Sequence, residues 1–333
     1  MTKLGRFWRI RQPQFLAIWP ATALLFALSP FIATGSVSGS SVLTVFSFAS
    51  VLAIASIGQT IVIQQGGLDL TVPGVISLAA VLVTKFPGGS NAELALWMAI
   101  AIAAGAASGL LCGLAITRLR ITPFVATLGV NALLYGFVEY LTKGTSTQAV
   151  PSALGDFAVN RIHGVPYLAI VAVLAVVIVE IGIRATKMGR RFVAVGTSNR
   201  AARAAGMRVI AFQIATYVLA GAIYALAGVL LAGYLGIPSL FVGDSYLLPT
   251  IAVVVLGGTS LLGGAGSVAA TAVGAVFLVQ LEQVTLGMGA TAAIQDIIEA
   301  AIIAIGVILR LIPWRQALYV IGYSPSARIA SET

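Results

Sequence analysis

The chain has 333 residues, of which 59% are hydrophobic and only 9% are charged, and its mean hydropathy is +1.04. A soluble domain carries roughly 25% charged residues, so this chain cannot cover a water-soluble globule with polar side chains. The net charge of +9 does not indicate nucleic-acid binding, because the basic residues lie in short loops between apolar runs. A single cysteine, Cys112, and a single histidine, His163, exclude a disulfide framework and argue against a metal site built from these residue types.

The first apolar segment follows a basic stretch in residues 1–14, which contains Lys3, Arg6, Arg9 and Arg11. This arrangement resembles a secretory signal peptide. No small-x-small cleavage site is evident, however, and many more apolar segments come after it. We therefore expect residues 15–34 to be retained as the first membrane span, preceded by a short cytoplasmic segment.

A bilayer core of about 30 Å requires roughly 20 apolar residues per helix. The hydropathy pattern predicts about ten such helices. They cover residues 15–34, 42–65, 72–86, 94–117, 121–142, 165–184, 210–236, 247–262, 266–288 and 293–312. The third and the eighth are short and rich in glycine or proline, which is typical of interrupted spans.

The distribution of charge supports this count. Basic residues cluster after the predicted fourth, sixth and tenth helices; they are Arg118, Arg120, Arg184, Lys187, Arg190, Arg191, Arg200, Arg203, Arg208, Arg310, Arg315 and Arg328. An even number of helices places all these groups and both termini in the cytoplasm, as the positive-inside rule requires. The sequence thus predicts an all-α, polytopic membrane protein with one domain over residues 1–333. Within it, 185–209 form a cytoplasmic loop and 313–333 a cytoplasmic tail.

The most polar interruption of an apolar run is "QTIVIQQGGLDLTVPGVISLAAVLV" (59–83). Gly66 and Gly67 permit unusual backbone angles, whereas Pro73 fits only near the start of a new helix. Asp69 and Thr71 are both suitable N-cap residues for that helix. Two interpretations stay open: Asp69 only caps a broken helix, or the break lines a solute route or gate.

A second segment resembles the first. "VVVLGGTSL" (253–261) repeats features of "VIQQGGLDL" (62–70), so that Gly257, Gly258 and Thr259 become further candidates for a pathway or gate. Interrupted helices at matching places are common in transporters and mark the binding region. Chance similarity between apolar segments is the alternative.

Other polar residues lie inside apolar helices. Thr127 and Asn131 could line a route for a neutral polyhydroxylated solute, or they could form hydrogen bonds between helices. Glu180 and Arg184 are four residues apart on one predicted helix and are expected to pair. Ionisable residues within membrane segments are candidates for function by default, which draws attention to Glu282, Asp296 and Glu299.

The basic loop contains "GRRFVAVGTSNRAARAAGMRV" (189–209). A short helix beginning near Asn199 and ending at Gly206 would place Arg200 and Arg203 on one face. Such a helix could dock onto another protein. Alternatively, the loop only sets the topology and contacts anionic headgroups.

Four ordered motifs resemble a known family. "GGLDLTVPGVISLAAVL" is similar to a "GGIDLSVG"-type signature, "ITPFVATLGVNALLYG" (121–136) to a "PPFIATLG" segment, and "VLGGTSLLGGAGSVAATAVGA" (255–275) to a "GGTSLxGGxGSV" stretch, while the 189–209 loop has the family's Gly-Arg and Ala-Ala-Arg pattern. The family is that of permease subunits of bacterial ABC importers of the ribose class, among the branched-chain amino acid/sugar inner-membrane translocators. The resemblance spans about residues 40–312. Pro73 and Ala269–Ala270 depart from positions where glycine is frequent, which leaves the particular sugar open.

The resemblance implies a monosaccharide or sugar-like substrate and a multi-pass location in the bacterial inner membrane. It also implies several partners: a second copy or a close paralogue, cytoplasmic ATP-binding cassette subunits beneath, and a periplasmic solute-binding protein above. Residues 199–206 would be the helix that receives motion from the ATPase.

The sequence itself argues against a nucleotide site in this chain. All four lysines follow a threonine, so a P-loop of the form G-x-x-x-x-G-K-S/T cannot occur. ATP and magnesium would be used by a partner, and no cofactor is expected here. The alternative is a proton- or sodium-coupled secondary transporter that uses Asp69, Glu282, Asp296 or Glu299. An intramembrane enzyme is disfavoured because no convergent nucleophile and base stand out.

Overall fold

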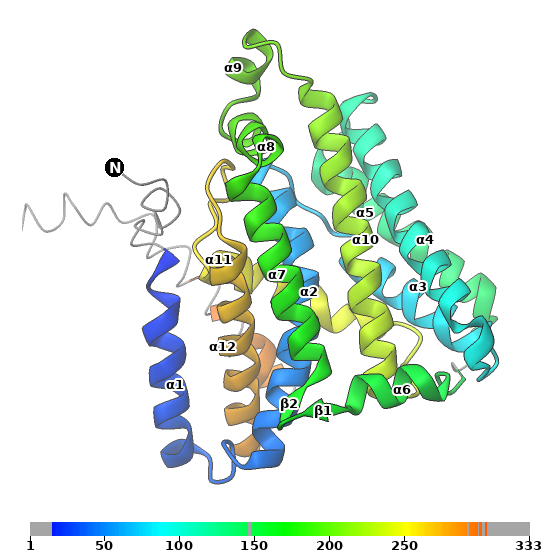
Figure 1. The fold of residues 1–333 in the computed structure, drawn as a ribbon, viewed down its shortest axis with the longest axis vertical. Coiled ribbons are helices and arrows are strands. Elements are labelled where there is room, and N and C mark those ends of the chain that lie inside the picture. Colours follow the sequence, from blue (N-terminus) through cyan, green and yellow to red (C-terminus); the bar gives the residue numbers. More distant parts are fainter. Residues whose placement is uncertain (1–14, 146–147, 292, 299, 302–303, 305–333) are drawn as a thin grey trace, which may run out of the picture.

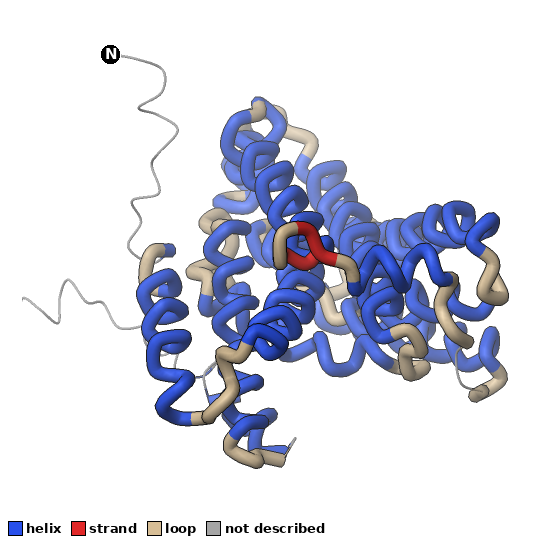
Figure 2. The backbone as a smooth tube through the Cα atoms, turned by 60° about the horizontal axis from the view of Figure 1, so that its bottom comes forward, coloured by secondary structure: helices blue, strands red, loops and turns tan. Residues whose placement is uncertain are grey.

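The structure, a computed structural model, describes residues 15–145, 148–291, 293–298, 300–301 and 304. Its helices are α1 (Ile18–Ile32), α2 (Gly39–Gln64), α3 (Val72–Lys85), α4 (Asn91–Thr117), α5 (Pro123–Thr142), α6 (Ser152–Val159), α7 (Tyr167–Ala185), α8 (Lys187–Thr197), α9 (Asn199–Ala204), α10 (Val209–Leu235), η3 (Val242–Tyr246), α11 (Leu247–Leu256) and α12 (Val268–Gly287). Two short antiparallel strands, β1 (Arg161–Ile162) and β2 (Val165–Pro166), form a hairpin beside α6 (Figures 1 and 2). The predicted all-α polytopic class is confirmed.

Six described helices, α2, α4, α5, α7, α10 and α12, are long and apolar enough to cross a membrane. Shorter apolar helices are α1, α3 and the segment Val242–Leu256. These helices overlap the first nine predicted spans. Residues 293–298 are helical and belong to the tenth, whose remainder lies mostly outside the described residues. The terminal segments 1–14 and 313–333, and with them the predictions about Arg310, Arg315 and Arg328, also lie outside them, as does Glu299.

Helix α2 is the centre of the bundle. It packs against α7, α10, α11 and α12 (Figure 1), and its residues are almost continuously buried from Ala49 to Gln64. A helix that is apolar or small on every face is expected in the interior of a bundle. The end of α2 at Gln64 is therefore held from several sides.

The closest helix pair is α4 and α10, which meet through glycines. Gly105, Gly109 and Gly113 are spaced four apart on α4 and lie against the backbone of α10 at Gly221, Tyr217 and Ile214. Small residues at this spacing allow two membrane helices to approach until their backbones touch. The pair forms a rigid wall beside α2 and α3.

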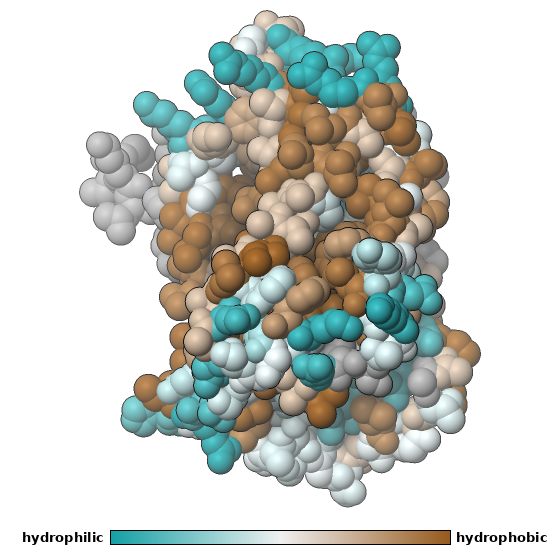
Figure 3. Space-filling view, turned by 90° about the vertical axis from the view of Figure 1, so that its right-hand side faces the viewer, coloured by the Kyte–Doolittle hydropathy of each residue, from teal (hydrophilic) through white to brown (hydrophobic). Residues whose placement is uncertain are grey.

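The surface has the pattern of a membrane protein. Large apolar side chains are exposed on α5 and α7, including Leu133, Phe137 and Ile178. Polar side chains gather at the end formed by α8 and α9, above a broad apolar band (Figure 3). The basic residues of 184–208 lie at this end, which the positive-inside rule assigns to the cytoplasm.

Four elements were not expected from the sequence: α6, the β1–β2 hairpin, α8 and η3. The segment 189–209 was predicted to hold one short helix, but it holds the end of α8 as well as α9. In α8 the apolar Phe192 and Val195 alternate with basic residues at helical spacing, so one face packs on the bundle while the other remains polar. Because such a helix contains no long apolar run, hydropathy alone does not predict it.

Candidate functional site: two helix breaks and their links to α8

The first helix break is the non-helical segment 65–71, between α2 and α3. Gly66 has a φ of +75°, a left-handed conformation that favours glycine. A side chain on Gly67 would collide with the hydroxyl of Tyr217 on α10. Both glycines of the predicted motif are thus required by the geometry of the turn, one by its backbone angle and one by close packing.

Asp69 stabilises the part of this break that leads into α3. It is fully buried, and its Oδ1 accepts hydrogen bonds from the backbone N–H of Thr71 at 2.9 Å and from the Thr71 hydroxyl at 2.6 Å. Its Oδ2 is buried without a hydrogen-bond partner among the described residues. Thr71 occupies the N-cap position of α3, but its side chain makes no cap bond. Of the two candidate cap residues, Asp69 therefore shapes the turn and Thr71 is its donor.

The second break is segment 257–267, between α11 and α12. Gly258, Gly263 and Gly264 all have positive φ angles. Gly257 lies directly against the backbone of Thr271 in the first turn of α12, so a larger residue would not fit there. Thr259 is fully buried nearby in the chain. The predicted glycine pair thus begins a tight loop that reverses the chain direction.

The two breaks meet at the end of α2. The backbone N–H of Gly264 donates a hydrogen bond of 2.8 Å to the carbonyl oxygen of Gln64. Gly263 lies beside the backbone of Gly66 and of Gly196 on α8. The two predicted segments contact each other, and the contact is made by Gly263 and Gly264 rather than by Gly257 and Gly258.

Helix α8 is attached to the same point. The side-chain amide of Gln65 donates a hydrogen bond of 2.7 Å to the carbonyl oxygen of Phe192 on α8. Gly196 of α8 lies against the carbonyl of Gln64, where a Cβ atom would not fit. A displacement of α8 is therefore expected to act on both breaks, because Gly196 meets the backbone of Gln64 and Gly263 directly.

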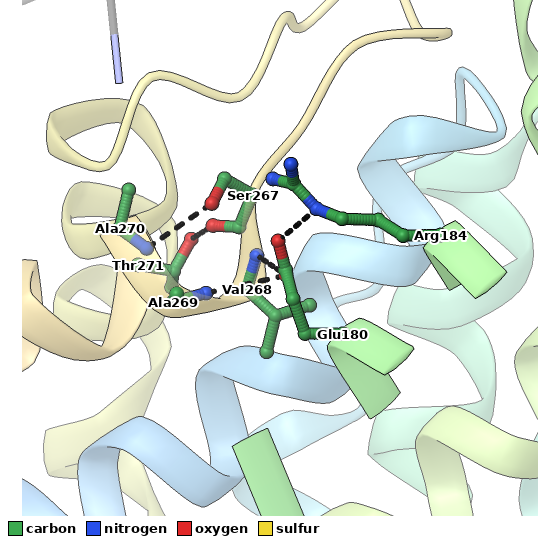
Figure 4. Close-up of polar contacts among 7 residues, drawn as sticks. All are labelled: Glu180, Arg184, Ser267, Val268, Ala269, Ala270 and Thr271. Atoms are coloured by element: carbon green, nitrogen blue, oxygen red, sulfur yellow. Dashed lines mark hydrogen bonds and ion pairs between the residues drawn. The ribbon is translucent and has the colours of Figure 1, made fainter. Parts of the chain in front are cut away.

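A third link joins α7 to the second break (Figure 4). Glu180 forms an ion pair with Arg184, as the i, i+4 spacing predicted. Its other carboxylate oxygen accepts hydrogen bonds from the N–H groups of Val268 at 2.9 Å and Ala269 at 3.4 Å. A carboxylate at the N-terminus of α12 satisfies free donors and suits the helix dipole. Glu180 thus fastens the start of α12 to the helix that leads into α8.

The polar residues predicted within α5, Thr127 and Asn131, both form hydrogen bonds inside the protein. Asn131 Oδ1 accepts a hydrogen bond of 2.8 Å from the N–H of Gly74 on α3, and the Thr127 hydroxyl donates to the carbonyl of Pro123 in its own helix at 2.8 Å. For Asn131 this geometry agrees with the interhelical alternative. It places Asn131 next to the start of α3, and so one turn of helix from the first break.

The short helix α9 lies beyond α8, at the extreme end of the molecule (Figure 1). The Ser198 hydroxyl accepts a bond from the N–H of Ala201 at 3.3 Å, and Gly206, with a φ of +76°, follows the last turn. Asn199 begins the helix, while Arg200 and Arg203 are exposed. Among the described residues both arginines are exposed, which leaves them available to a partner.

We expect Asp69 to act through the geometry of its turn. In Asp69→Asn the amide oxygen can still accept both bonds from Thr71, so folding and transport should remain close to those of the unaltered protein. In Asp69→Ala both bonds are lost inside the protein, which should cost on the order of 1–3 kcal/mol and reduce transport several-fold. Uptake and thermal stability measured on both variants check this. Normal uptake by Asp69→Ala would show that the turn does not matter.

A bundle of membrane-length helices in which two interrupted helices meet at one point is the architecture of a multi-pass membrane transport protein. Among the described residues, no group of three or more His, Cys, Asp or Glu side chains could hold a metal ion. Residues 41–307 match the family model described as the permease component of the branched-chain amino acid transport system. This chain belongs to that family and is a non-catalytic, multi-pass component of the inner membrane.

Curated relatives agree with this assignment. The chain is 31% identical to the ribose import permease protein RbsC of Escherichia coli (strain K12), over 91% of this chain and 94% of the relative. It is 30% identical to the autoinducer 2 import system permease protein LsrC of Yersinia enterocolitica, over 86% and 81%, and 33% identical to the fructose import permease protein FruF of Bifidobacterium longum, over 78% and 74%. No solved structure matches the chain significantly.

Proposed function

We propose that this chain is the membrane-spanning subunit of an ATP-driven importer that moves a monosaccharide or a sugar-like solute inward by alternating access. The three relatives described above are import permeases for ribose, autoinducer 2 and fructose. The observation that carries the mechanism is the set of direct contacts from α8 to both helix breaks at Gln64 and Gln65. Through these contacts, a displacement of the cytoplasmic end can be transmitted directly to the helix breaks within the membrane.

The proposal assigns the energy source to other polypeptides. A cytoplasmic ATP-binding cassette subunit binds ATP and magnesium and pushes on α9, through Arg200 and Arg203. The motion passes through α8 to the breaks, and two copies of this chain, or this chain and a close paralogue, rock about them. A periplasmic solute-binding protein delivers the sugar, so the pathway itself needs little affinity. No cofactor is bound by this chain in the proposed cycle.

The experiment that tests this proposal compares two energy sources in cells that express the complete transporter. Uptake of labelled ribose, and of other monosaccharides in turn, is measured with an uncoupler added while ATP is held constant. We expect accumulation to persist, and to stop when ATP is depleted. Collapse of uptake with the uncoupler alone would instead favour coupling to protons or sodium through a carboxylate such as Asp69 or Asp296.

A further inference from the structure

A cavity of about 430 Å³ opens at the α8–α9 end, between the last turn of α4 and the first turn of α10. Its lining has two chemically distinct parts. Three of its lining residues, Arg118, Arg203 and Arg208, are basic. The remaining lining is apolar and is formed by Met207, Val209, Ile210, Ala211 and Ile214.

The positive charge of this cavity is not neutralised within the part of the chain that the structure describes. No carboxylate there lies within ion-pair distance of the three arginines, since the ion pair found is Glu180 with Arg184. All three arginines are exposed. The first turn of α10, a helix of 27 residues, forms one wall, and its free N–H groups add partial positive charge. The cavity is suited to an anion with several oxygen acceptors.

Exposed apolar side chains precede the cavity on α4. Leu111 and Leu114 lie three residues apart near the end of α4, and Arg118, the residue that follows the helix, comes four residues later. Leu111 is 56% exposed and Leu114 is 39% exposed. Ile214, which lines the cavity, packs against Gly113 of α4. Exposed apolar side chains of α4 thus precede Arg118, and the apolar lining of α10 follows Arg208.

We propose that this cavity binds an anionic phospholipid of the cytoplasmic leaflet, with its phosphate held by Arg118 and Arg208 and an acyl chain lying along Leu111 and Leu114. An acidic surface of a protein would use the arginines but would have no use for exposed apolar side chains on the membrane side of them. Basic pockets between membrane helices on the cytoplasmic side are a recurrent form of lipid headgroup site. This site does not depend on which solute the protein carries.

The proposal has a consequence for the coupling segment. Arg203 is on α9 and Arg208 is the residue before α10, whereas Arg118 follows α4. A single phosphate that contacts Arg118 and Arg208 would tie the α9–α10 connection to the end of α4. Anionic lipid should therefore raise the thermal stability of the purified protein as well as bind to it.

The test uses the full chain, purified in detergent and titrated with phosphatidylglycerol or phosphatidylcholine, with bound lipid counted by native mass spectrometry and stability followed by thermal unfolding. We expect phosphatidylglycerol to bind more tightly and to raise the unfolding temperature. Because each basic residue near a membrane surface contributes about a factor of five, the double variant Arg118→Gln, Arg208→Gln should weaken its binding about 25-fold. Glycerol phosphate, which has the headgroup but no acyl chains, should give no comparable stabilisation.

The matched control removes the same charge from α8, in the double variant Lys187→Gln, Arg191→Gln. It should bind phosphatidylglycerol as the unaltered protein does, and equal weakening in both variants would mean that only net charge matters, which overturns the proposal. If the cavity variant does not fold, Arg118→Lys, Arg208→Lys keeps the charge and should bind within a few-fold. Unchanged lipid binding together with lost association of the ATP-binding subunit would assign the cavity to that protein instead.

Discussion

Replacing Gly221 by leucine should abolish the folded protein in the membrane. Gly221 faces the backbone carbonyl of Gly105, and no side chain stands between them. Any Cβ atom at this position would therefore meet a carbonyl group, which cannot be relieved by a change of rotamer. Even Gly221→Ala should lower the free energy of unfolding by about 1–3 kcal/mol, because the two helices would have to separate.

The matched control is Gly182→Ala on α7. No atom lies within 4 Å of the Cβ that this change adds, so the variant should keep its stability or gain up to about 1 kcal/mol from the better helix propensity of alanine. Thermal unfolding in detergent and the amount of protein recovered from membranes measure both variants. Equal stability of Gly221→Ala and Gly182→Ala would show that α4 and α10 do not touch as the structure describes.

Reversing the charge of Arg203 should separate ATP hydrolysis from transport. Arg203 is exposed on α9, which lies farther from the bundle than any other described helix at that end (Figure 1). If α9 docks on the proposed ATP-binding subunit through this positive charge, a glutamate there would weaken the contact. We expect Arg203→Glu to reduce uptake at least tenfold while the protein remains in the membrane at its normal level.

The comparison for this variant is Arg191→Glu, which makes the same charge change on the exposed face of α8. Its uptake should stay close to normal. Uptake and ATPase activity measured together distinguish a lost contact from a misfolded protein. Undiminished uptake by Arg203→Glu would refute the role assigned to α9.

The sequence predicts the fold class, the breaks at Gly66–Gly67 and Gly257–Gly258, and the pairing of Glu180 with Arg184, because each depends on local pattern. Composition excludes a soluble domain, glycine marks the positive φ angles, and a spacing of four residues brings two side chains of one helix together. The same kind of argument would have indicated a close helix contact at Gly105, Gly109 and Gly113, since small residues four apart are a known signal. The spacing of the glycines does not, however, predict that α10 is the helix that packs on this face.

The links that make the site are of another kind. Gln65 bonds to Phe192 across 127 residues of sequence, and Glu180 reaches Val268 across 88. No local sequence pattern indicates contacts between residues so far apart in the chain, so both contacts could be found only from the structure. Asp69 is a similar case: its residue type is typical of a helix cap, and only the geometry showed that its Oδ1 binds Thr71 and that its Oδ2 is buried without a partner among the described residues.

The measurement that tests the account most directly is transport into sealed vesicles that contain this chain and no companion subunit. Labelled ribose should equilibrate at most, with no accumulation against its gradient, whether ATP, a proton gradient or a sodium gradient is supplied. Adding the ATP-binding subunit, the solute-binding protein and ATP should restore accumulation. Uphill uptake by the chain alone would contradict the account, because the energy would then have entered through this polypeptide.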